Sequence, residues 1–147
     1  MEDRFKKTEY HLYQYKDIDK LNQVADLRIK KLLNDVSLGG GDMFGEKSSK
    51  TNKFNSNVEN EVIKRDETIR FEIDNLKRDK ENRILEKQII NASLDLLEAE
   101  EKKLVELRYF SKPTKSWTSI STELNQSVDN CIKVRKKVIG KLSDYIL

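Results

Sequence analysis

Five polar side chains in the last third of the chain have the types and spacing needed to bind nucleic-acid bases and phosphates. Helical spacing puts them on the outer face of one helix, and they are Asp129, Asn130, Lys133, Lys136 and Lys137. Asparagine can form two hydrogen bonds with an adenine edge, lysine can donate to guanine, and aspartate can accept from cytosine. This face therefore suits entry into the major groove of DNA. Alternatively, Asp129 and Asn130 only support the start of the helix by interacting with its dipole.

The residues from Ser116 to Leu147 have the pattern of a helix-turn-helix unit, which would position this face. In the first helix Ile120 is followed by the small residue Ser121, which lets two helix backbones approach each other. Asn125 can adopt the left-handed conformation that a tight turn needs, and Ser127 can cap the second helix. Apolar residues at helical spacing would close the inner angle between the helices: Leu124, Cys131, Val134, Val138 and Leu142.

The charge of the chain is distributed unevenly. The 147 residues are 37% charged and 36% hydrophobic, with a net charge of +3, which favours helices with solvated faces over a thick core. Residues 104–147 contain eight lysine or arginine residues and four acidic ones, whereas residues 58–103 contain ten and thirteen. The basic excess thus coincides with the helix-turn-helix pattern, as attraction to phosphates requires.

Other classes of protein are disfavoured by the composition. With one cysteine and one histidine, the chain offers no disulfide, no metal-binding cluster and no nucleophile–base pair. We therefore expect no enzyme activity, no catalytic residues, no metal and no cofactor. The glycines at 39–41 and 45 lack the Gly-Lys-Ser/Thr ending of a phosphate-binding loop. No apolar run suits a membrane span or a signal peptide, so we expect a cytoplasmic protein with no membrane partner.

The residues before position 92 have the pattern of a helical hairpin. An apolar stripe predicts a helix from Thr8 to Val36, and residues 37–57 have the composition of a flexible loop. From about Val58, apolar residues return at seven-residue spacing for some 50 residues, with Arg83 as a break. This spacing suits a long charged helix packed on a partner. We expect the partner to be the first helix, and a homodimer through these N-terminal helices is left open. The predicted domains are residues 1–92 and 93–147.

Aromatic and apolar residues near the domain boundary are interpreted as packing residues. Residues 94–110 would lie beneath the helix-turn-helix unit, and Pro113 would end that segment. Trp117 would close the small domain, and Cys131 is expected to be a buried hydrophobe and not a reactive thiol. Three N-terminal tyrosines could stack on exposed bases, but packing against the long helix is favoured for Tyr10, Tyr13 and Tyr15.

The C-terminal third resembles region 4 of bacterial sigma factors. EKKLVELRYF (101–110) is similar to its lead-in helix, SWTSISTELNQS (116–127) to its first helix and turn, and VDNCIKVRKKVIGKL to its recognition helix. The whole chain resembles small phage regulators of the RinA/ArpU type, which combine a Tyr-rich N-terminal helix, a Gly/Ser loop and a long charged helix with such a unit. The chain has no counterpart of sigma region 2, which melts promoters. It also has Asn125 and Ser121 where glycine and alanine are more usual.

This resemblance implies specific roles for residues of the C-terminal unit. The base-reading positions would be Val128, Asp129, Asn130 and Lys133. Phosphates would be bound along the same helix by Arg135, Lys136, Lys137 and Lys141. Phosphates would also meet the start of the preceding helix, at Lys112, Lys115, Ser116, Thr118 and Ser119.

The sequence thus predicts an all-α protein in which a long helical hairpin precedes a helix-turn-helix domain like sigma region 4. The function expected from the resemblance is a sequence-specific transcription regulator in a bacterial host cell. It would activate late phage or prophage genes by binding double-stranded DNA near a promoter, together with host RNA polymerase. Two other functions remain open. One is a helical adaptor that contacts polymerase without reading DNA, and the other is the recognition subunit of a DNA-packaging machine.

Overall fold

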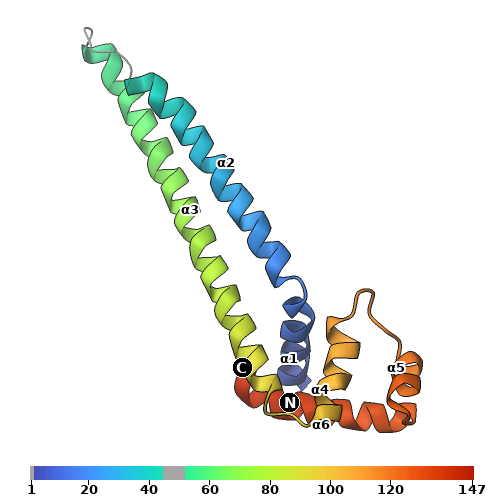
Figure 1. Cartoon of the computed structure of the whole chain (residues 1–147). Helices are drawn as coiled ribbons and strands as arrows, with labels where there is room; N and C mark the ends of the chain where they lie inside the picture. The colour runs from blue at the N-terminus through green and yellow to red at the C-terminus, as the bar shows by residue number, and fades with distance from the viewer. Residues whose placement is uncertain (1, 45–51) are drawn as a thin grey trace. The chain divides into compact units, whose positions relative to one another are not determined.

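The computed structural model describes residues 2–44 and 52–147, and all regular secondary structure in these residues is helical (Figure 1). The elements in chain order are α1 (Glu2–Tyr15), α2 (Ile18–Phe44), α3 (Asn52–Leu94), α4 (Ala99–Val105), a π-helical turn η1 (Glu106–Phe110), α5 (Trp117–Leu124) and α6 (Val128–Ile146). The predicted all-α class with a long helical hairpin is confirmed. No helix in the described ranges is both long and apolar enough to cross a membrane.

Residue contacts divide the chain into two units, which are described separately. The hairpin unit comprises residues 20–82, and the core unit comprises residues 1–19 together with 83–147. The boundary predicted from the sequence, at residue 92, places residues 1–19 and 83–92 in the hairpin. The structure groups them with the C-terminal helices, because α1 packs against α6 and η1 and because Ile90 of α3 is buried in the same apolar cluster.

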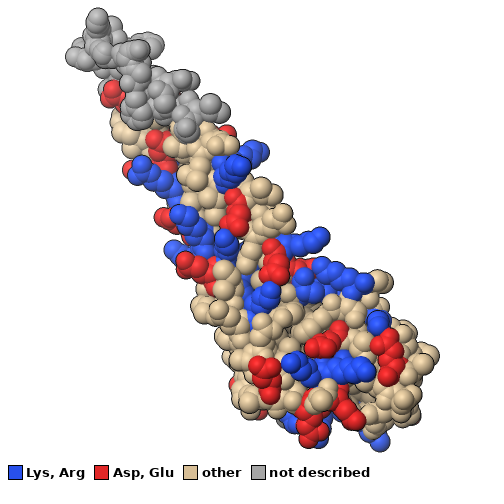
Figure 2. All heavy atoms as spheres, viewed as in Figure 1, with Lys and Arg blue, Asp and Glu red and all other residues tan. Residues whose placement is uncertain are grey.

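In the hairpin unit, α2 and the first part of α3 lie side by side and run in opposite directions (Figure 1). Alternating steps of three and four residues place one side of each helix toward the other, as in coiled coils. On α2 these positions are Asn22, Ala25, Ile29 and Leu32, and on α3 they are Val62, Ile69, Ile73 and Leu76; all are buried or half-buried. Lys80 of α3 donates a hydrogen bond to Asp26 of α2 at 2.6 Å. On the face of the molecule shown in Figure 2, basic and acidic side chains are interspersed.

The expected single helix from Thr8 to Val36 is wrong, because it is broken at Lys16 and Asp17. The amide of Asp17 donates to the carbonyl of Gln14 at 2.9 Å, so the chain makes a tight turn there. After the turn, Ile18 is almost fully buried and begins α2. The periodicity of the sequence could not reveal this break, because the stripe continues at helical spacing on both sides.

The prediction of a flexible loop over residues 37–57 is wrong at both ends. Helix α2 continues to Phe44 and α3 begins at Asn52, while residues 45–51 lie outside the described part. Glycine lowers helix stability by only about 1 kcal/mol relative to alanine. Adding residues to a formed helix is easier than starting one. A helix that has already formed can therefore continue through the glycines at 39–41.

Helix α3 ends at Leu94, although the sequence suggested a longer helix. The amides of Leu96 and Leu97 bond to the carbonyls of Ser93 and Leu94 at 3.1 and 3.0 Å, which tightens the chain into a turn. A capping box then starts α4, because the Glu98 side chain and its partner Glu101 satisfy each other's backbone amides.

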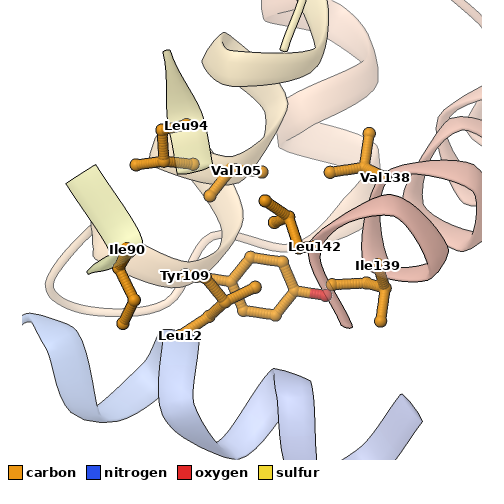
Figure 3. Close-up of a cluster of buried hydrophobic side chains, with 8 residues drawn as sticks. All are labelled: Leu12, Ile90, Leu94, Val105, Tyr109, Val138, Ile139 and Leu142. Carbon is orange, nitrogen blue, oxygen red and sulfur yellow. The ribbon is translucent and has the colours of Figure 1, made fainter. Parts of the chain in front are cut away.

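The core unit is built around one apolar cluster to which α1, α3, α4, η1 and α6 all contribute (Figure 3). Its buried members are Leu12, Ile90, Leu94, Val105, Tyr109, Val138, Ile139 and Leu142. Burying each aliphatic side chain contributes about 1.5–3 kcal/mol, so this cluster is the main source of stability for the unit. Leu12 ties the N-terminal helix to segments more than 75 residues away in the chain.

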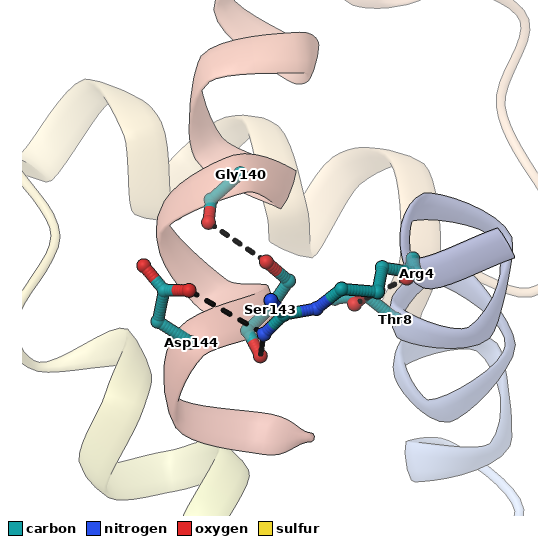
Figure 4. A network of polar contacts seen from close by, with 5 residues as sticks. All are labelled: Arg4, Thr8, Gly140, Ser143 and Asp144. Carbon is teal, nitrogen blue, oxygen red and sulfur yellow. Dashed lines mark hydrogen bonds and ion pairs between the residues drawn. The ribbon is translucent and has the colours of Figure 1, made fainter. Parts of the chain in front are cut away.

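Polar contacts also fasten α1 to α6 (Figure 4). The Arg4 guanidinium donates to the carbonyl of Ser143 at 3.2 Å and pairs with Asp144 at 3.4 Å. The hydroxyls of Thr8 and Ser143 are buried, and each donates to a carbonyl of its own helix, that of Arg4 at 2.8 Å and that of Gly140 at 2.9 Å. Both buried hydroxyls beside this contact therefore have a hydrogen-bond partner.

Candidate nucleic-acid interface

Helices α5 and α6 are joined by a tight turn whose conformation is set by Asn125. This residue has φ 56° and ψ 41°, the left-handed conformation expected from the sequence. The following amide, of Gln126, donates to the carbonyl of Ser121 at 3.1 Å and so closes the end of α5. Ser127 then caps α6 by accepting from the amide of Asn130 at 3.1 Å, as predicted.

A small apolar cluster fills the inner angle of the α5–α6 pair. Leu104, Ile120 and Cys131 are buried, and Leu107, Trp117, Leu124 and Val134 pack around them. Burial raises the pKa of the Cys131 thiol, which agrees with its predicted role as a buried hydrophobe. Trp117 is half-buried, and the Arg108 guanidinium lies over its ring, 4.7 Å from the ring centre.

The outer face of α6 is exposed and polar. Asp129, Asn130, Lys133, Lys136 and Lys137 all lie open to solvent, whereas Val128 is half-buried. Helical spacing places Lys133, Lys136 and Lys137 on one side of the helix. The Asn130 amide donates to the side chain of Gln126 at 2.6 Å, so it also stabilises the turn. The structure thus accommodates both interpretations of Asn130.

Three other lysines that were predicted to bind phosphate form ion pairs with carboxylates of the chain itself. Lys112 pairs with Asp17 at 2.9 Å, Lys115 with Glu123 at 2.6 Å, and Lys141 with Glu101 at 3.0 Å. In contrast, no carboxylate within residues 2–36 and 59–147, whose side chains are described, forms an ion pair with Lys133, Lys136 or Lys137. These three lysines are therefore the cations of α6 most available to an external anion.

Arg135 has an internal role that the sequence does not indicate. It was expected to bind phosphate, but its guanidinium donates to one carboxylate oxygen of Glu9 at 2.6 and 2.8 Å. The hydroxyl of Tyr109 donates to the same oxygen at 2.5 Å. The guanidinium also lies over the rings of Phe5 and Trp117, at 5.0 and 5.7 Å. We call Glu9, Tyr109 and Arg135 the Glu9 network.

Burial and hydrogen bonding shift the pKa values of Tyr109 and Arg135 in the Glu9 network. Burial raises the pKa of Tyr109 far above its usual range, and the hydrogen bond to Glu9 raises it further. Burial alone would lower the pKa of Arg135, but its bonds to Tyr109 and Glu9 outweigh this and raise it. Tyr109 therefore stays neutral and Arg135 stays charged, so both continue to donate to the Glu9 carboxylate.

Glu101 is a second buried carboxylate that fastens α6. Only 6% of its side chain is exposed, and Lys141 donates to both of its oxygens, at 3.0 and 3.1 Å. Burial favours the neutral form of Glu101, but the bonds from Lys141 and from the Glu98 amide outweigh it and lower the pKa. Lys141 thus holds α6 against the start of α4.

The start of α5 exposes small polar residues. Ser116, Thr118 and Ser119 are exposed, and the Ser116 hydroxyl accepts from the amide of Ser119 at 3.2 Å. The preceding carbonyl, of Lys115, accepts from Arg108 at 2.8 Å, which holds the start of α5 against η1. The three residues that were predicted to bind phosphate at the start of α5 therefore lie close together at the surface.

The N-terminal aromatic residues serve mainly in packing. Tyr13 meets the ring of Tyr109 edge-on with ring centres 4.8 Å apart, and Tyr15 stacks on Phe110 at 4.2 Å. The Tyr15 hydroxyl also donates to Asn91 of α3 at 2.5 Å. Tyr10 differs, because 61% of it is exposed. His11 contacts Glu86, and no group of three metal-ligating side chains occurs in the part of the chain that the structure describes.

The chain belongs to the protein family of unknown function DUF722, whose family model matches residues 19–144. The matched range begins where α1 has ended and includes most of α6, so it spans the hairpin and the α5–α6 pair. Neither a curated protein nor a solved structure matches the chain.

We predict that Asn125→Ala lowers the free energy of unfolding by about 1–2 kcal/mol, because alanine is strained in the left-handed conformation. Asn125→Gly is the matched control and should leave stability unchanged or slightly raised, since glycine adopts this conformation freely. Urea denaturation followed by circular dichroism measures both. Equal stability of the two variants would contradict the account of the turn.

We predict that Glu9→Gln lowers the free energy of unfolding by about 1.5–3 kcal/mol, because it weakens charge-assisted hydrogen bonds in a part-buried site. Asp144→Asn is the matched control. It breaks an exposed pair with Arg4 and should cost at most about 1 kcal/mol. Thermal and urea unfolding measure both variants, and a Glu9→Gln effect no larger than that of Asp144→Asn would contradict the role of the Glu9 network.

Proposed function

We propose that this protein is a sequence-specific regulator of transcription that binds double-stranded DNA through α5 and α6, used as a helix-turn-helix. The observation that carries the proposal is the exposed outer face of α6, where three lysines lie without ion pairs in the described part of the chain. Lysines left available on one side of a capped helix favour binding to a polyanion.

The arrangement of α6 suits entry into the major groove. Its first two turns offer Asp129, Asn130 and Lys133 to base edges, with Val128 at the margin to contact a thymine methyl. Lys136 and Lys137 lie one turn further on and would contact phosphates. Each good base contact contributes about 1–3 kcal/mol of discrimination.

Supporting contacts come from the start of α5. Ser116, Thr118 and Ser119 are exposed there and would meet a phosphate through hydroxyl and backbone groups. Lys112 and Lys115 would join them by exchanging partly exposed ion pairs for phosphate contacts. Arg135 and Lys141 act indirectly in this proposal, since both hold α6 against the rest of the core unit.

The biological setting that we propose follows from the resemblance to RinA/ArpU-type phage regulators and to sigma region 4. In that setting the protein activates late genes of a phage or prophage in a bacterial cell, near a promoter and with host RNA polymerase. The chain shows no sequence counterpart of the sigma region that melts promoters.

Selection from a random pool of duplexes, followed by gel shift, tests DNA binding. We predict enrichment of a defined site. The double variant Lys133→Ala with Lys137→Ala should weaken binding to this site by at least about tenfold. The slope of log affinity against log salt concentration should become shallower by about one for each phosphate that is no longer neutralised. The matched control, Lys7→Ala with Lys103→Ala, removes two exposed lysines outside the proposed interface and should change binding little.

Two results would contradict the proposal. One is a pool from which no duplex is enriched. The other is binding that responds equally to the Lys133/Lys137 and Lys7/Lys103 pairs. Capture of purified RNA polymerase by a protein that enriches no duplex would instead favour the adaptor function.

A further inference from the structure

The end of α3 exposes a stripe of apolar residues on the side opposite its buried residues. Leu85, Ile89 and Ala92 follow one another at steps of four and three residues, and Leu96 continues the stripe in the turn after the helix. Leu85, Ile89 and Leu96 are 56%, 46% and 65% exposed. We call these four residues the α3 stripe. Such a stripe is typical of a helix that packs on another helix.

Helix α2 exposes a second group of apolar residues. Leu21, Val24 and Leu27 are 37%, 53% and 59% exposed, although Asn22 and Ala25 of the same turns are buried. We call these three residues the α2 stripe. Both buried apolar clusters of the described residues lie in the core unit. The α2 stripe belongs to neither cluster and therefore leaves apolar side chains exposed in the described part of the hairpin unit, as is common at protein–protein contact sites.

The two stripes carry opposite charge. Residues 20–31, around the α2 stripe, contain four lysine or arginine residues and one aspartate. That aspartate, Asp26, is already paired with Lys80. Residues 84–98, around the α3 stripe, contain three acidic residues and one lysine. Of these, Glu86 contacts His11, Asp95 pairs with Lys102, and Lys87 pairs with Asp19.

These charges distinguish between the ways in which two copies could associate. Two α3 stripes would bring acidic flanks together, and two α2 stripes would bring basic flanks together. Like charges in contact disfavour both arrangements. When an α2 stripe packs on an α3 stripe, apolar surface meets apolar surface and the flanking charges are opposite. Each stripe is therefore complementary to the other stripe but not to a second copy of itself.

We propose that the α2 stripe of one copy docks on the α3 stripe of a second copy. Two copies that use both of their stripes reciprocally form a closed dimer, and copies that use one stripe each toward successive neighbours form a ring or a row. Apolar burial provides the attraction, and the flanking lysines and carboxylates fix which helix meets which. The proposal is independent of DNA binding, since neither stripe includes a residue of α5 or α6.

Sedimentation velocity on the full chain without DNA tests this proposal. Wild-type protein should exceed the single-chain mass of 17.3 kDa as its concentration is raised. Val24→Glu with Leu27→Glu should keep the protein at the single-chain mass, and so should Leu85→Gln with Ile89→Gln. All four positions are exposed, so circular dichroism should show unchanged helix content. Tyr145→Gln is the control, because it changes an exposed aromatic residue outside both stripes and should leave association intact.

Mixing the two variants is the decisive experiment. Each variant retains one intact stripe, and the two intact stripes complement each other. An equimolar mixture should therefore form a species of two chains, although neither variant associates alone. A wild-type protein that stays at the single-chain mass at every concentration would overturn the proposal. So would a mixture that fails to pair, or loss of association in only one of the two variants.

Discussion

The carboxylate of Glu9 is the point on which the arrangement of the core unit depends. One of its oxygens accepts hydrogen bonds from Tyr109 of η1 and from Arg135 of α6, while Glu9 itself belongs to α1. Three helical segments that are distant in sequence thus meet at one atom. A part-buried charge of this kind is tolerated only when its partners are in place, so the network selects one packing of the three segments.

This constraint separates the two faces of α6. The inner face is occupied by Arg135, Val138, Ile139 and Leu142, which are held by α1 and η1. The outer face is left to Lys133, Lys136 and Lys137, whose side chains extend into solvent. A rigidly held helix with an available cationic face binds with less loss of conformational freedom than a mobile one. The N-terminal helix is therefore part of the proposed DNA-binding unit, even though it lies at the other end of the chain.

Features determined by neighbouring residues could be predicted from the sequence. The left-handed turn at Asn125, the cap at Ser127 and the burial of Cys131 depend on local conformation and on helical periodicity. The internal role of Arg135 could not be predicted in this way, because its partner Glu9 is 126 residues away. The ends of α2 and α3 were also missed, since composition alone does not show how far a helix continues once it has formed.

The central claim is that the outer face of α6 contacts DNA while the Glu9 network holds its inner face. Amide chemical shifts measured during titration with an enriched duplex test this claim most directly. The account predicts that the largest changes occur at residues 128–137 and at the start of α5, with small changes in α2. Changes centred on the hairpin, or none on addition of duplex, would contradict it.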